Sequence, residues 1–90
     1  MASVAVRADE GPPTVAQAAR KVRQVIAHRG SSADRPENTL ASFRRAIEVK
    51  ATVTEIDVRT TRDGVLVCLH DADLSRTTDG KGLVGEKTFA

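Results

Sequence analysis

The sequence has few of the side chains that mark several common classes of protein. Its 90 residues include one cysteine, Cys68, so no disulfide can form within the chain. Aromatic residues make up 2% of the sequence, as Phe43 and Phe89 alone. Proteins that bind single-stranded nucleic acid stack bases on such rings, and no DNA-reading motif is present. We therefore expect no nucleic-acid partner, despite a formal net charge of +2.

Long apolar runs are absent as well. No stretch approaches the roughly 20 residues of a membrane-spanning helix, and residues 1–8 lack the apolar run of a signal peptide. These absences favour a cytoplasmic protein without a membrane span, and the sequence leaves its oligomeric state open. Cys68 itself lies in the apolar run 65–69, which predicts a buried, unreactive thiol.

The first 21 residues have the character of a tail or linker. Gly11, Pro12 and Pro13 interrupt any periodic pattern, and an alanine-rich segment, 15–21, follows Thr14. Thr14 is a good capping residue, so a short helix over 15–21 is possible. We predict a tail or linker over 1–21 and a single folded domain over 22–90.

Two elements are predicted in the first half of that domain. The β-branched run 22–27 predicts a strand that ends at His28-Arg29-Gly30, with His28 at its carboxyl end. Apolar residues then recur at helical spacing over 38–50, after a Pro-Glu-Asn-Thr segment that offers capping side chains.

Strict alternation over 53–59 predicts a strand with Glu55 and Asp57 on one face. A second strand over 65–69 follows too closely for a parallel crossover, so the two should form an antiparallel hairpin. A tight loop centred on Asp63 and Gly64 places His70 opposite Asp57, and a loop two residues longer places it opposite Glu55. Either register brings His70 beside the two acids.

These residue types suit phosphodiester chemistry. Glu55 and Asp57 offer hard oxygen ligands to a divalent cation, Ca²⁺ or Mg²⁺, although such a pair alone is more often part of a solvated sheet face. His28 and His70 can transfer protons near neutral pH. The guanidinium of Arg29 suits bidentate contact with a phosphate. Together these residues indicate a site that none of them indicates alone.

Six motifs in fixed order carry a resemblance to a known family. They are His28-Arg29-Gly30, Pro36-Glu37-Asn38-Thr39, Glu55-x-Asp57, Thr61-x-Asp63-Gly64, His70-Asp71 and Leu74-x-Arg76-Thr77-Thr78-x-Gly80. This string closely resembles the opening of the glycerophosphodiester phosphodiesterase family. The resemblance implies an α/β fold, the phospholipase C-like phosphodiesterase type of TIM barrel. Such a barrel takes about 250 residues, so 22–90 is expected to be a partial domain, about its first third, truncated at the C-terminus.

The resemblance also implies an activity, the metal-dependent hydrolysis of small glycerophosphodiesters to an alcohol and glycerol 3-phosphate. The neighbouring glycerol hydroxyl would attack phosphorus, and water would open the resulting cyclic phosphate. The implied roles are general base and general acid for His28 and His70, phosphate binding for Arg29, metal binding for Glu55 and Asp57, and pocket lining for Glu37 and Asn38. Asp71 and Arg76 receive no chemical role.

The sequence departs from the family pattern at two positions. Lys50 stands where the family commonly has glycine, and Thr54 replaces a bulkier apolar residue. The family's third acidic ligand and a later lysine are not within the 90 residues, so the isolated chain is expected to be inactive.

Two alternative functions are compatible with these residues. They are a phospholipase D-like or sphingomyelin-cleaving enzyme, and a non-catalytic remnant that binds phosphate or metal. The intact Pro-Glu-Asn-Thr motif favours the glycerophosphodiesterase.

Overall fold

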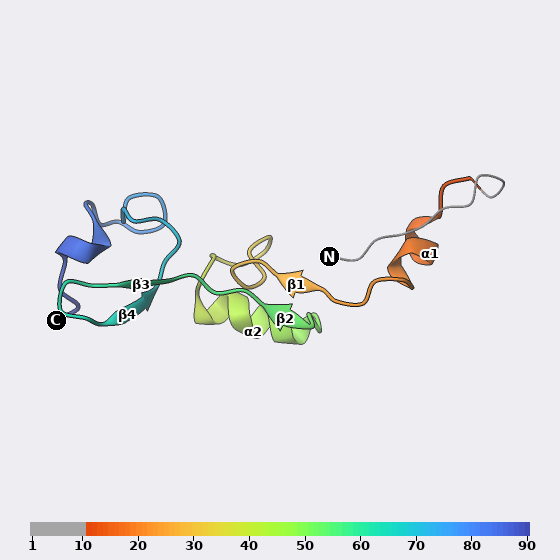
Figure 1. The fold of residues 1–90 in the computed structure, drawn as a ribbon, viewed down its shortest axis with the longest axis horizontal. Helices are drawn as coiled ribbons and strands as arrows, with labels where there is room; N and C mark the ends of the chain where they lie inside the picture. Colours follow the sequence, from red (N-terminus) through yellow and green to blue (C-terminus); the bar gives the residue numbers. More distant parts are fainter. Residues whose placement is uncertain (1–10) are drawn as a thin grey trace.

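A computed structural model describes residues 11–90, so the start of the predicted tail, 1–10, lies outside the described residues. The chain is elongated, with extents of 61 × 25 × 21 Å, and its elements follow one another along the long axis (Figure 1). They are α1 (Val15–Ala19), β1 (Ile26–Ala27), α2 (Leu40–Glu48), β2 (Val53–Thr54), β3 (Val58–Thr60), β4 (Leu66–Cys68) and the 3₁₀ helix η1 (Val84–Glu86). Within 11–90, no helix is long and apolar enough to cross a membrane.

Helix α1 is short and capped as predicted. The Thr14 hydroxyl accepts a hydrogen bond from the Gln17 amide at 3.2 Å, and the Gln17 side chain accepts one from the Thr14 amide at 2.9 Å. This reciprocal capping box satisfies two amides of the first turn. The helix ends at Ala19, before the predicted limit of Lys21, and buries no residue.

Helix α2 confirms the predicted helix, with both ends defined by specific contacts. Thr39 and Ser42 form a capping box at its start. At its end the Lys50 amide donates to the Ile47 carbonyl and the Ala51 amide to the Ala46 carbonyl, each at 3.0 Å. This is a Schellman motif, and it places Lys50 in the left-handed region with a φ of 61°.

Strands β1 and β2 are parallel neighbours, with Ile26 opposite Val53 and Ala27 opposite Thr54. Helix α2 is the crossover between them, and Figure 1 shows it alongside β2. The predicted first strand, 22–27, is confirmed only over its last two residues, Ile26–Ala27. One strand–helix–strand unit of this kind is the repeating element of an α/β barrel.

The predicted single strand over 53–59 is wrong, because the ladder is interrupted between β2 and β3. The backbone changes partner in this interval. The Glu55 amide donates to the Ala27 carbonyl at 2.9 Å, whereas the Asp57 carbonyl accepts from the Leu69 amide at 3.0 Å. Residues 55–57 thus connect a parallel pair to an antiparallel one.

The hairpin of β3 and β4 is antiparallel as predicted, but both predicted registers are wrong. Val58 lies opposite Cys68 and Thr60 opposite Leu66, one residue from either prediction. The reason is a three-residue loop, closed by a 2.9 Å hydrogen bond from the Thr61 amide to the Val65 carbonyl. Gly64 ends this loop with a φ of 82°, the usual geometry of three-residue hairpins. The register places His70 opposite neither acid.

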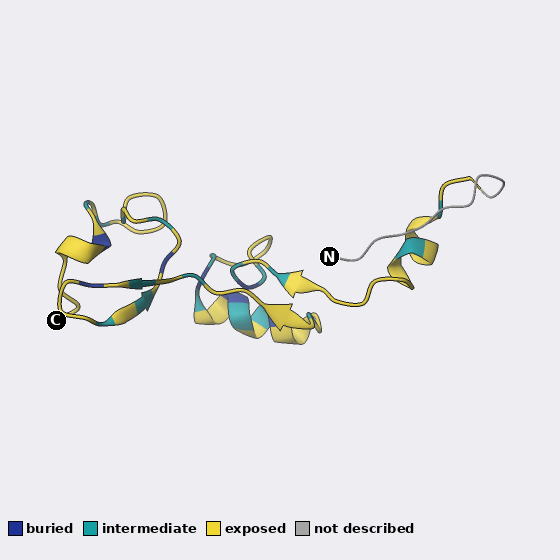
Figure 2. Ribbon diagram, viewed as in Figure 1, coloured by how far each residue is buried: buried dark blue, intermediate teal, exposed yellow. Residues whose placement is uncertain are grey.

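The apolar core of the described residues is small, comprising Ala46, Leu69 and Val84. Figure 2 shows exposed residues over most of the ribbon. In the hairpin, alternate positions are exposed and half-buried, and Cys68 lies on the exposed face with Val58 and Leu66. The prediction of a buried thiol is therefore wrong, because this face of a two-stranded sheet is uncovered.

Candidate functional site

The predicted site residues come together where three segments meet. Arg29 follows β1, Asn38 precedes α2, and Asp57 lies between β2 and β3. The Asn38 amide donates to the Arg29 carbonyl at 2.9 Å, which joins the first two segments. Arg29 and Asn38 both adopt left-handed backbone, with φ values of 59° and 55°. Such conformations are uncommon outside glycine and concentrate at functional sites.

A buried serine supports this turn from below. Ser42 on α2 is fully buried, and its hydroxyl lies 3.1 Å from the Arg29 carbonyl and 2.9 Å from the Thr39 carbonyl. Gly30 packs directly on it, since a Cβ added to Gly30 would lie 2.8 Å from the Ser42 carbonyl carbon. The glycine therefore allows the His28-Arg29-Gly30 turn to rest on the start of α2.

Arg29 lies between two carboxylates. Its Nη1 donates to Glu37 Oε2 at 3.2 Å, and its Nε is 3.3 Å from Asp57 Oδ2. The second contact is an ion pair without a hydrogen bond, because the buried Nε has no hydrogen-bond partner among the described residues. The Arg29 side chain is 18% exposed, so the two acids hold a guanidinium that is largely out of solvent.

Asp57 is fixed by Asn38 as well. The Asn38 side-chain amide donates to Asp57 Oδ2 at 3.0 Å, and Asn38 Oδ1 accepts from the Asp57 backbone amide at 3.2 Å. Asn38 is buried, at 8% exposed. The predicted pocket residues Glu37 and Asn38 therefore contact the predicted phosphate and metal ligands directly.

His28 faces the other acid of the pair. Its Nε2 lies 3.4 Å from Glu55 Oε1, and both side chains are substantially exposed. At this distance the two groups form an ion pair when the imidazole is protonated. The sequence predicted that His70 would lie beside these acids. The histidine in contact with Glu55 is instead His28, from the end of β1.

His70 is connected to Glu37 through Asp71 and Arg76. Its Nδ1 is 2.7 Å from Asp71 Oδ1, and Arg76 Nε donates to Asp71 Oδ2 at 2.8 Å. Arg76 Nη2 also donates to Glu37 Oε1 at 2.6 Å. An ionised carboxylate only accepts hydrogen bonds, so a hydrogen bond between these two atoms requires the proton on Nδ1 of His70.

The charges of this chain of contacts reinforce one another. Hydrogen bonds from Arg76, and then from His70, hold the pKa of the Asp71 carboxyl far below its usual range. The hydrogen bond from Arg76 is also the largest cause that lowers the pKa of Glu37, ahead of the bond from Arg29. Both acids are therefore ionised at neutral pH, and the pKa of the Arg76 guanidinium is raised by them.

The carboxylates of Glu55 and Asp57 are oxygen donors of the kind that a hard divalent cation binds. Residues 11–90 contain no group of three or more histidine, cysteine or acidic side chains placed to hold a metal ion. Calcium takes about six to eight oxygen ligands and magnesium about six. The remaining ligands would have to be waters, substrate oxygens or a further acid.

The sequence assigned no chemistry to Asp71 and Arg76, and the structure places both in the network. An acid directly after a candidate histidine was the available signal, because neighbouring carboxylates commonly orient imidazoles. Arg76 gave no such signal. Its contact with Glu37 spans 39 positions of the sequence.

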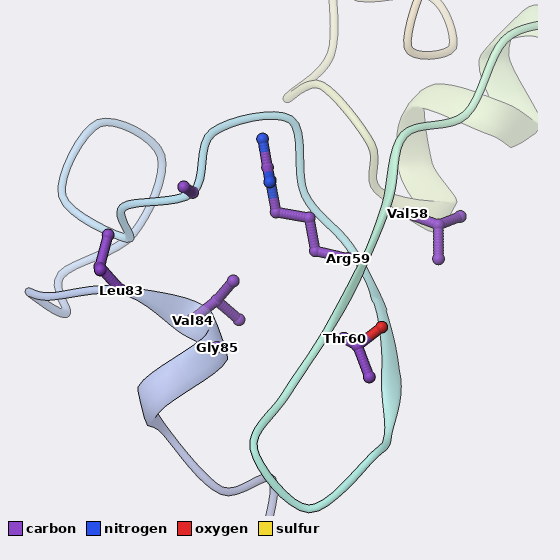
Figure 3. A pocket seen from close by; sticks show the side chains of 7 residues that line it. Val58, Arg59, Thr60, Leu83, Val84 and Gly85 are labelled. Carbon is purple, nitrogen blue, oxygen red and sulfur yellow. The ribbon is translucent and has the colours of Figure 1, made fainter.

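A groove of about 420 Å³ lies apart from these residues. It is lined by Val58, Arg59, Thr60, Ala72, Leu83, Val84 and Gly85, between the hairpin and η1 (Figure 3). Arg59 connects the two regions, since its Nε and Nη2 donate to the His70 carbonyl at 2.9 and 2.6 Å. None of the predicted site residues lines this groove.

Comparison with known proteins adds independent information. The model of the glycerophosphoryl diester phosphodiesterase family matches residues 28–90. The chain is 56% identical over 66 residues to "Probable glycerophosphodiester phosphodiesterase 1" of Mycobacterium tuberculosis, covering 73% of this chain and 24% of that protein. The chain thus spans about a quarter of this relative.

Two solved structures are similar to this fold. The glycerophosphodiester phosphodiesterase of Agrobacterium tumefaciens matches with a TM-score of 0.72 and 42% identity, over 74% of this chain and 29% of its own. An Oleispira antarctica phosphodiesterase in complex with the product sn-glycerol-3-phosphate matches with a TM-score of 0.66 and 57% identity, over 68% of this chain and 25% of its own.

Proposed function

The chain belongs to the glycerophosphoryl diester phosphodiesterase family, and we propose from this that it supplies the first part of an active site that hydrolyses glycerophosphodiesters. Its fold is that of the opening part of the TIM-barrel enzymes of this family. The products would be an alcohol and glycerol 3-phosphate. Residues 22–90 would form this part of the domain, and residues 1–21 a linker that precedes it.

The observation that carries the proposal is the position of the cluster on the fold. His28 and Arg29 directly follow β1, and Glu55 directly follows β2, its parallel neighbour. Active sites of TIM barrels lie at the carboxyl ends of the parallel strands. His28, Arg29 and Glu55 therefore lie at the edge of the sheet where enzymes of this fold have their active sites.

Arg29 is suited to the phosphate because its guanidinium is charged and held in place by Glu37 and Asp57. A fixed donor group of this kind stabilises the negative charge that develops on the phosphoryl oxygens. The acids around Arg29 and Arg76 outnumber these two arginines, which favours a cation beside the phosphate. They are Glu37, Glu55, Asp57 and Asp71.

His28 and His70 would transfer the protons. One accepts the proton of the glycerol hydroxyl that attacks phosphorus, and the other donates a proton to the departing alcohol. The cyclic phosphate formed in this step would be opened by water with the roles reversed. The side chains of both histidines are about half exposed, at 60% for His28 and 45% for His70, so a small substrate can reach them.

Glu55 and Asp57 would hold the divalent cation, Ca²⁺ or Mg²⁺. The family is in general metal-dependent. When bound, such a cation neutralises negative charge on the phosphoryl oxygens and orients the substrate. Asn38 would keep Asp57 in position for this role, because it binds both the carboxylate and the backbone amide of that residue.

The substrate class follows from the relatives. The Oleispira antarctica structure contains sn-glycerol-3-phosphate as product, and the Mycobacterium and Agrobacterium proteins are named glycerophosphodiester phosphodiesterases. These names favour a small glycerophosphodiester over sphingomyelin for this chain.

A chimera tests the proposal directly. Residues 28–90 would replace the matched segment of the Oleispira antarctica phosphodiesterase, and release of glycerol 3-phosphate from glycerophosphocholine would be measured. We expect turnover with Mg²⁺ or Ca²⁺ and none in EDTA. Residues 1–90 alone should release none, since Glu55 and Asp57 leave most of the metal's ligand positions to other groups. A folded chimera without activity, or with full activity in EDTA, would contradict the proposal.

A further inference from the structure

The side chain of Arg76 bridges two acids from distant parts of the chain. Its Nε and Nη2 donate to the two oxygens of Asp71 at 2.8 and 3.1 Å. Its Nη1 and Nη2 donate to the two oxygens of Glu37 at 3.2 and 2.6 Å. The guanidinium is thus bidentate on both sides, a geometry that its planar fork allows and an ammonium group does not.

Each acid in turn contacts a residue proposed to act on the substrate. Asp71 holds Nδ1 of His70 at 2.7 Å, and Glu37 accepts from Arg29 at 3.2 Å. Arg76 is therefore two contacts away from the proton-transfer group and two from the phosphate-binding group. No other described side chain makes hydrogen bonds to both Asp71 and Glu37.

Exposed ion pairs usually contribute little to stability, and the Arg76 side chain is 48% exposed. Networks with bidentate arginine geometry are the exception. Glu37 is also only 18% exposed, so its contacts are less screened by solvent. The bidentate contacts therefore hold both carboxylates in fixed positions and also contribute to stability.

We propose that Arg76 is a positioning residue, which aligns His70 through Asp71 and Arg29 through Glu37. The proposal rests on the proposed function for its catalytic meaning. Its structural content is narrower: Arg76 fixes the Asp71 carboxylate, and this carboxylate holds the His70 imidazole with its proton on Nδ1. That content can be measured without any turnover, so its failure is distinguishable from failure of the proposed hydrolysis.

The test is the ratio of the two neutral tautomers of His70, measured by nitrogen NMR of the imidazole in the chain of residues 1–90. We expect the proton mainly on Nδ1 in the unaltered chain. Arg76→Gln should lower the ratio of Nδ1–H to Nε2–H about twofold to fivefold, the range for loss of one exposed charge contact. Arg76→Lys should not restore it, because lysine cannot bind both acids bidentately.

Two further variants calibrate the result. Asp71→Asn removes the charged acceptor and sets the size of the largest expected change. Arg44→Gln makes the same chemical change as Arg76→Gln on the exposed surface of α2, where residues 11–90 show no ion pair to Arg44. It should leave the tautomer ratio unchanged.

Three results would overturn the proposal. They are a ratio in Arg76→Gln that equals that of the unaltered chain, an equal change in Arg44→Gln, and a predominance of Nε2–H in the unaltered chain. The last of these needs no variant, so the proposal stays testable if Arg76→Gln does not fold.

Discussion

Asn38 and Asp57 bind each other through two hydrogen bonds, one from the Asn38 side chain to the Asp57 carboxylate and one from the Asp57 amide to the Asn38 side chain. The contact links the start of α2 to the segment between β2 and β3, 19 positions further along the chain. A buried amide thus fixes a proposed metal ligand in its backbone and its side chain at once.

Removal of this amide should destabilise the chain. We expect Asn38→Gly to lower the free energy of unfolding by about 1.5–3 kcal/mol, the range for hydrogen bonds to a charged group. Asn38→Ala should lower it by about 1 kcal/mol more, because alanine is less favourable at the left-handed backbone of this residue. Urea unfolding measures both, and equal stability of Asn38→Gly and the unaltered chain would refute the role of the amide.

The contact between Gly30 and Ser42 gives a second prediction. A Cβ at position 30 would clash with the backbone of buried Ser42, so Gly30→Ala should cost about 1–3 kcal/mol. Gly64→Ala is the matched control, since Gly64 has a similar positive φ of 82° and nothing lies within 4 Å of the added atom. Thermal unfolding of the two variants should show a lower midpoint for Gly30→Ala than for Gly64→Ala. A similar midpoint for both would show that the turn does not rest on α2.

Lys50 offers a stabilising substitution. It is the second residue after α2 and has a φ of 61°, a conformation that costs a residue with a Cβ about 1–2 kcal/mol. Lys50→Gly should therefore raise the free energy of unfolding by about 1 kcal/mol. Lys50→Ala removes the same charge and keeps the Cβ, so it should give no such gain. Chemical denaturation of the three proteins distinguishes the effect of backbone from that of charge, and an equal gain in both variants would contradict it.

Acid should weaken the network around Arg76. The pKa values of Asp71 and Glu37 are lower in the folded chain than usual, chiefly because both accept hydrogen bonds from Arg76. Their ionised forms therefore stabilise the fold fully above about pH 5, and this stabilisation is lost as pH falls below about 4. Arg76→Gln should show a smaller loss between pH 7 and 3 in urea titrations, and Arg44→Gln the same loss as the unaltered chain. An equal loss of stability in Arg76→Gln and the unaltered chain would show that the contacts of Arg76 do not cause the weakening by acid.

The elements with strong local signals were predicted well from the sequence. The cap at Thr14, helix α2 and the antiparallel hairpin are confirmed, because capping chemistry, helical spacing and a short connection act over a few residues. The hairpin register was not predictable to one residue. It depends on whether Gly64 adopts left-handed backbone, and a glycine permits this without requiring it.

Contacts between segments that are distant in the sequence could not be predicted. The alternation over 53–59 predicted one strand, but Glu55 is hydrogen-bonded to Ala27 and Asp57 to Leu69, so the strand is interrupted between them. The hydrogen bonds from Arg76 to Glu37 could not be predicted either, since they depend on the relative position of two loops. The site's residue types were thus evident in the sequence, and the links that orient them were not.

We propose that His28 and His70 transfer the protons of a phosphodiester cleavage. The turnover number for glycerophosphocholine tests this role, measured with Mg²⁺ in the chimera that carries residues 28–90. We predict that His28→Ala and His70→Ala each lower it at least about 100-fold, as expected for loss of a general acid or base, and that Arg44→Gln leaves it unchanged. Turnover within about twofold of the unaltered chimera in either histidine variant would contradict this role.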